Sequence, residues 1–264
     1  MMKFIAISSM LAYGINTGYL VWQLQATDKK NTSLVFAWLA VVLHTLYIGL
    51  LCQQQNGFSF SILSVASLNI LGVALVLLLT ALTKPVEKIG IIVFPLAAII
   101  LGLDVIINPL PHLLPVHTGA IGIHISTSIL AFSLLTIAAI QAILLKIQNK
   151  QLKQHPPTKF ILLLPSLQSM ETLLFQMIAS GVFILSLSLG TGFLFLHDLF
   201  AQHLVHKTIL SLLAWVIFCA ILIGRQRYGW RGRVAVNWIL VGFLFLLLSY
   251  FGSKFVLELI LVRT

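Results

Sequence analysis

Charged residues are scarce in this chain of 264 residues, where they make up 8% of the sequence and only 6 are acidic. Apolar residues make up 59%, and the mean hydropathy is +1.07. A soluble domain needs more polar surface than this, so the composition indicates a protein that lies in a lipid bilayer. No alternating strand pattern with regular turns occurs, which argues against an outer-membrane barrel. The sequence therefore predicts an all-α fold.

Motifs for thiol chemistry and catalysis are also missing. The two cysteines, Cys52 and Cys219, are expected near opposite membrane faces, too far apart for a disulfide. The chain has no CxxC pair, no HExxH zinc motif, no serine-nucleophile motif and no P-loop. Because no reaction type follows from the residues, we do not predict an enzyme.

What the chain does contain is a series of apolar stretches. A hydrocarbon core about 30 Å thick needs roughly 20 apolar residues per helix. Together, the stretches that meet this requirement account for nearly the whole length and predict a polytopic bundle of about eight transmembrane helices in one domain, 1–264. They are residues 4–24, 33–53, 59–82, 89–107, 119–145, 172–196, 208–224 and 234–262. Within that domain, Pro156 and Pro157 predict a hinge between the first five helices and the last three.

The basic residues are distributed unevenly along the chain. The net charge is +10, and lysines and arginines concentrate in loops one, three, five and seven, as in GRQRYGWRGR (224–233). The positive-inside rule then predicts that these loops face the cytoplasm and that both termini are periplasmic. The expected location is the bacterial inner membrane, and the basic charge is read as a topology signal, with the lipid bilayer rather than nucleic acid as the partner.

Six of the eight histidines fall on the predicted periplasmic side. Three lie in HDLFAQHLVHKT (197–208), and His124 lies in the first turns of the fifth helix. Imidazole can ligate haem iron and can exchange protons near neutral pH. His203 and His206, three residues apart, would share one helix face, and Asp198 could orient a ring by accepting its N–H. These segments could flank one pocket, although histidines at a membrane interface also serve as structural hydrogen-bonding residues.

His44 is different because it lies in the middle of a predicted span. An ionisable group in hydrocarbon is costly and usually faces a partner or a cavity. His44 therefore has two possible interpretations: a functional residue, or a structural residue that forms a hydrogen bond between helices.

Several segments resemble a known family. GAIGIHISTSILAFSLL (119–135), GVFILSLSLGTGF (181–193), HKTILSLLAW (206–215), RYGWRGRVAV (227–236) and VGFLFLLLSYFG (241–252) occur in an order similar to the cytochrome c assembly membrane proteins of the CcsA and CcmC type. The resemblance covers about residues 57–252. It places His124 where the family has an external haem-ligand histidine at the start of a helix.

The chain departs from the haem-presenting members at their other ligands. Their tryptophan-rich outer motif is replaced by AQHLVHKTIL (201–210), and two further family histidines fall at Ile223 and near Leu261. The pattern is most similar to the YpjD and HemX-like branch, which lacks the tryptophan motif.

The resemblance implies a haem-handling protein that assists cytochrome c biogenesis by axial histidine ligation near the periplasmic face. Haem b is the expected cofactor, and a membrane protein of biogenesis or transport is the expected partner. His124 and His206 are the predicted iron ligands, and the predicted binding residues are completed by His203, His44 and Asp198. Two alternatives stay open: a membrane scaffold that has lost haem presentation and acts through its partner, and a periplasmic divalent-metal site.

Overall fold

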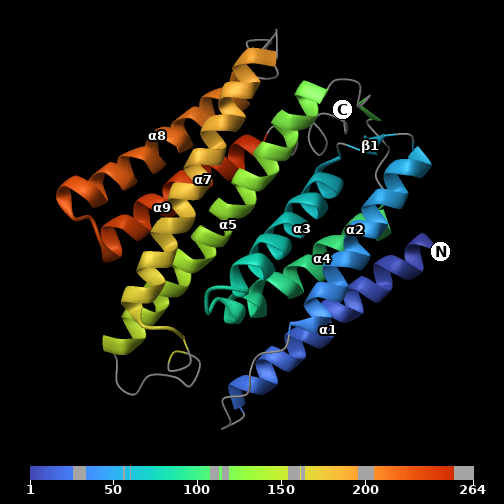
Figure 1. The fold of residues 1–264 in the computed structure, drawn as a ribbon, viewed down its shortest axis with the longest axis horizontal. Coiled ribbons are helices and arrows are strands. Elements are labelled where there is room, and N and C mark those ends of the chain that lie inside the picture. Colours follow the sequence, from blue (N-terminus) through green and yellow to red (C-terminus); the bar gives the residue numbers. More distant parts are fainter. Residues whose placement is uncertain are drawn as a thin grey trace. The chain divides into compact units, whose positions relative to one another are not determined.

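The computed structural model describes residues 1–25, 34–55, 57–59, 61–107, 113–114, 119–153, 161, 164–195 and 205–252. Within these ranges eight helices are long and apolar enough to cross a membrane, which confirms the predicted all-α polytopic fold (Figure 1). They are α1 (Met2–Gln25), α2 (Val35–Gln55), α3 (Ile62–Ala81), α4 (Gly90–Ile107) preceded by the short helix η1 (Glu87–Ile89), α5 (Gly119–Lys153), α7 (Leu167–Phe195), α8 (Val205–Tyr228) and α9 (Gly232–Leu247) extended by the π-helical turn η2 (Leu248–Gly252).

The chain divides into two compact units. Unit 1 comprises residues 1–116 and 162–164, and unit 2 comprises residues 117–161 and 165–264. The division falls before α5, whereas the sequence suggested a hinge after it. The reason is that α5 packs against α7 and α9, so that it belongs with the later helices. The interpretation of the whole chain as one domain stays a prediction.

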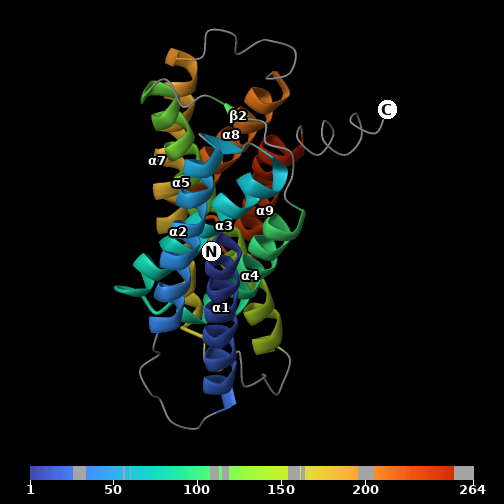
Figure 2. The same cartoon turned by 90° about the vertical axis from the view of Figure 1, so that its right-hand side faces the viewer.

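In unit 1, α1 packs against α2 and α4, and α3 packs against the same two helices. Figure 2 shows α1 and α2 running antiparallel. Inside the unit, the ring of Tyr13 stacks on that of Phe94, with centroids 5.9 Å apart. A short antiparallel pair, β1 (Phe58–Ser59) and β2 (Leu113–Leu114), joins the segment before α3 to the segment after α4. Two-residue strands were not expected from the sequence, and they lie outside the spans.

In unit 2, α5 and α7 lie antiparallel along one another, and α8 and α9 form a hairpin (Figure 1). α8 also packs against α7, and α9 packs against α5. The principal contacts therefore form a ring in the order α5, α7, α8, α9, with α5 and α8 on a diagonal.

Three helices of this unit are longer than predicted, and one of them is α8, which covers Val205–Tyr228 instead of 208–224. α5 has 35 residues, about 52 Å at 1.5 Å per residue, so it extends well past a hydrocarbon core of about 30 Å. Its basic last turns continue to Lys153, beyond the predicted end at residue 145. α7 begins at Leu167 rather than at residue 172, because the Ser169 backbone N–H donates to Ser166 Oγ at 3.3 Å and caps the helix start.

Gly181 allows α5 and α7 to approach closely. A Cβ atom at position 181 would lie 2.8 Å from two side-chain carbons of Leu135, which is fully buried on α5. Small residues have this role between membrane helices, where packing replaces the hydrophobic effect.

We expect Gly181→Ala to lower the free energy of unfolding by about 1–3 kcal/mol, because the added methyl group overpacks the interface. The measurement is thermal unfolding of the purified protein in detergent. Gly190→Ala on the same helix is the matched control, since a Cβ there meets nothing within 4 Å. Equal unfolding temperatures for the two variants would contradict the close packing at Gly181.

Candidate functional site

His124 lies in the first turns of α5 and points at α7. Its Nδ1 is 2.9 Å from the backbone carbonyl oxygen of Ser188 and 3.4 Å from Thr191 Oγ1. The imidazole is half-buried. The site is therefore built by one helix start and the facing turn near the end of α7.

These contacts select the tautomer of the neutral imidazole. A carbonyl oxygen can only accept, so Nδ1 carries the proton and donates it to Ser188. The hydroxyl of Thr191 donates to the same carbonyl at 2.9 Å, so toward His124 it acts as a second acceptor. Nε2 then holds a lone pair, which is the arrangement of a histidine that ligates a metal through Nε2 and is held by its other nitrogen.

The surroundings of His124 fix the position of its ring. Gly192 lies directly against it, because a Cβ at position 192 would be 3.1 Å from the ring carbon Cε1. One turn further along α5, Ser128 Oγ is 2.5 Å from Ser188 Oγ. The turn of α7 that accepts from His124 is thus tied to α5 a second time.

The start of α8 lies at the same end of unit 2. Ser249 Oγ in η2 donates to the Lys207 carbonyl oxygen at 2.9 Å and accepts from Ser211 Oγ at 2.7 Å. The ring of Tyr250 in η2 contacts that of Phe132 on α5, with centroids 4.6 Å apart. Through η2, the first turn of α8 is connected to the half of α5 that carries His124.

His206 occupies that first turn and is exposed. The helix that carries it, α8, packs against α7 and α9, and both of these helices also pack against α5. Among the described residues no hydrogen bond joins His206 to His124, so the two predicted ligands share one end of one unit without touching. His203 and Asp198 lie outside the described residues.

Within the same described ranges, no three histidine, cysteine or acidic side chains come together as metal ligands.

His44 belongs to unit 1 and has no exposed surface. Its Nδ1 lies 3.4 Å from the Tyr13 hydroxyl, and its Nε2 lies 3.0 Å from Ser67 Oγ. Both ring nitrogens therefore have partners, and the ring links α1, α2 and α3. This arrangement fits the structural alternative, a hydrogen bond between buried helices.

Asp104 is a buried acidic residue of unit 1, with 4% of its surface exposed. In the structure Ser64 Oγ donates to its Oδ1 at 3.0 Å. The contact ties α3 to α4.

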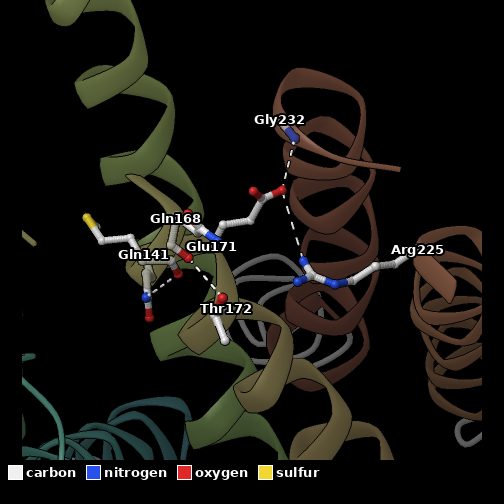
Figure 3. A network of polar contacts seen from close by, with 7 residues as sticks. Gln141, Gln168, Glu171, Thr172, Arg225 and Gly232 are labelled. Carbon is white, nitrogen blue, oxygen red and sulfur yellow. Dashed lines mark hydrogen bonds and ion pairs between the residues drawn. The ribbon is translucent and has the colours of Figure 1, made fainter. Parts of the chain in front are cut away.

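The opposite end of unit 2 carries an acidic junction that the sequence did not reveal. Figure 3 shows the Glu171 carboxylate of α7 between the Gly232 backbone N–H and Arg225. Glu171 Oε1 accepts from Gly232 at 3.3 Å and lies 4.0 Å from an Arg225 guanidinium nitrogen. The guanidinium also lies 3.7 Å from the centre of the Phe175 ring, a cation–π contact. One carboxylate thus joins α7, α8 and α9.

Fold and site together define a class: multi-span membrane proteins in which a histidine at the end of a helical unit is held through one of its ring nitrogens. The chain belongs to the cytochrome c assembly family, since the family described as "Cytochrome C assembly protein" matches residues 28–261. This finding confirms the predicted family.

Two relatives extend the comparison. The chain is 30% identical to "Inner membrane protein YpjD" of Escherichia coli K12, over 98% of this chain and 100% of the relative. It is 33% identical to an "Uncharacterized 28.8 kDa protein in nifR3-like 5'region" of Azospirillum brasilense, over 55% of this chain and 56% of the relative. No solved structure matches the chain. The chain is a multi-pass inner-membrane protein, and the predicted similarity to the YpjD branch is confirmed.

The two described histidines with ring contacts should differ in their effect on stability. We expect His44→Ala to lower the free energy of unfolding by roughly 3 kcal/mol, because it leaves a cavity and removes two buried hydrogen bonds. His124→Ala removes a half-buried ring and should cost less than about 1 kcal/mol. Thermal unfolding in detergent without added haem measures both. Similar losses for the two variants would show that His124 is also a structural residue.

Proposed function

We propose that this protein binds haem in the inner membrane and assists cytochrome c biogenesis, with His124 as an axial ligand of the iron. The observation that carries the proposal is the 2.9 Å contact between His124 Nδ1 and the Ser188 carbonyl oxygen. This contact leaves the Nε2 lone pair available and holds the ring in place. Family membership supports the same function, because it places the chain among the cytochrome c assembly proteins.

The donor chemistry of this end of unit 2 fits haem. Neutral imidazole is a common axial ligand of haem iron, and His124 presents it from a fixed ring. His206, exposed at the start of α8, is the second ligand that we propose, with His203 and Asp198 as further predicted contributors from the neighbouring segment. Iron bound in this way would supply the redox chemistry, whereas the residues of the chain hold and orient it.

The residues around His124 would then hold its ring in position for ligation. Ser188 keeps the Nδ1 proton in place, Thr191 shares it, and Gly192 leaves room for the ring. The aromatic cluster around Phe132 lies eight residues further along α5, about 12 Å at the rise of an α-helix. It connects the half of α5 that carries the ligand to η2, so the two proposed ligands are held by one packed unit.

The absorption spectrum of protein purified from membranes, with a pyridine haemochrome assay, tests the proposal. We expect a Soret band in the unaltered chain and its loss, or at least a tenfold decrease in haem content, in His124→Ala. The control is His155→Ala, which changes a histidine in the loop between the fifth and sixth predicted spans, on the predicted cytoplasmic side of the membrane. This variant should retain the band. Absence of a Soret band after haem supply would overturn the proposal and favour a scaffold that acts through a membrane partner.

A second variant tests the position of the ring rather than its presence. Gly192→Val should displace the His124 imidazole, because even a Cβ at this position comes within 3.1 Å of it. We expect haem affinity to fall about tenfold, the change that roughly 1.4 kcal/mol produces. Gly190→Val is the matched control, since its surroundings are open. If both variants bind haem equally well, the ring is not held as we propose.

A further inference from the structure

A cavity of about 380 Å³ lies between the last turns of α5 and the first turn of α9, at the end of unit 2 that is remote from His124. Its apolar floor is formed by Leu145 and Val236, both buried. Asn149 and Gly232 also line it. The cavity therefore has an apolar inner surface that opens between two helix ends.

The rim of this cavity is basic. Four cationic side chains line it, and all four are exposed: Lys146, Lys150, Lys153 and Arg233. The amine of Lys146 donates to Asn237 Oδ1 at 3.3 Å, so its direction is set by α9. In the part of the chain that the structure describes, none of the four forms an ion pair.

The acidic side chain in the described part of this unit is already engaged. Glu171 is the acidic residue of the described part of unit 2, and it contacts Arg225 and the Gly232 backbone. Among the described residues, the charge around the cavity is therefore not compensated, which is a condition that favours an anionic ligand. The positive-inside rule explains basic residues at one membrane face, but it does not require them to surround an apolar cavity.

We propose that this cavity binds the headgroup of an anionic phospholipid. The phosphate would contact the basic rim, and the glycerol and the first acyl carbons would cover Leu145 and Val236. Basic pockets between membrane helices bind such headgroups, and the apolar floor favours an amphiphile over free phosphate. The site is separate from the proposed haem ligands, so the two proposals can fail independently.

The test is lipid binding to the full-length protein in detergent, measured by native mass spectrometry. The probes are phosphatidylglycerol and phosphatidylcholine with identical acyl chains, each with and without excess inorganic phosphate at constant ionic strength. We expect selective retention of phosphatidylglycerol. In Lys150→Gln/Arg233→Gln its affinity should fall roughly 25-fold, about fivefold for each basic residue removed.

Arg227→Gln/Arg231→Gln is the matched control. It removes the same charge from exposed positions at the same end of the unit but outside the cavity lining, and it should change the affinity less than twofold. If both double variants lost affinity for phosphatidylglycerol equally, the lipid would be bound by general surface charge, and the proposed site would be overturned. Equal retention of both lipids, or displacement of phosphatidylglycerol by inorganic phosphate, would overturn the choice of an anionic lipid. Lys153→Gln, at the end of α5, provides a variant with little effect on packing should the first double variant unfold.

Discussion

Hydrocarbon offers no hydrogen-bond partners, and this constraint determines where the polar side chains of the eight spans lie. Several of them bond across a helix boundary. Ser9 Oγ on α1 donates to the Ala40 carbonyl oxygen of α2 at 2.8 Å, and Gln141 on α5 donates to that of Met170 on α7, also at 2.8 Å. The Trp215 indole donates to Ser186 Oγ, which links α8 to α7. Because lipid tails are as apolar as leucine, such bonds and close packing hold membrane helices together in place of the hydrophobic effect.

The same constraint separates the two histidines. His44 lies between three helices, and both of its ring nitrogens have hydrogen-bonding partners there. His124 lies in the first turns of a helix and uses one nitrogen on a backbone carbonyl. The difference comes from depth and neighbours rather than from residue type. A carbonyl oxygen can only accept a hydrogen bond, so it fixes the tautomer of the imidazole, whereas a hydroxyl can donate or accept and does not.

The sequence predicts the class of fold well, since the length of an apolar stretch can be read directly from the local sequence. Family membership and the position of His124 also follow from local sequence patterns. The partners of His124, the engagement of His44 and the contacts of Glu171 could not be predicted, because each depends on which helices pack together. The sequence placed a hinge at Pro156 and Pro157, whereas the division between units lies before α5, since proline marks a break in a helix and says nothing about its packing neighbours. Helix ends were also misjudged: hydropathy detects the apolar span, while α5 continues as a basic helix beyond it.

Because acidic residues are scarce, the two ends of unit 2 differ: one is basic, and the other carries polar groups without net charge. Basic residues at one end of a helical unit are either neutralised by acidic residues or left to interact with the surroundings. Glu171 engages Arg225, at a point where three helices meet. The cations on α5 and α9 have no such partner among the described residues, and they surround an apolar cavity rather than a solvated loop. The predicted membrane orientation depends only on how many basic residues there are and on which membrane face they lie. It does not explain why they surround the cavity, whereas a bound ligand would. At the other end, polar groups without net charge hold one imidazole in one tautomer, the condition under which a neutral nitrogen can serve as a ligand.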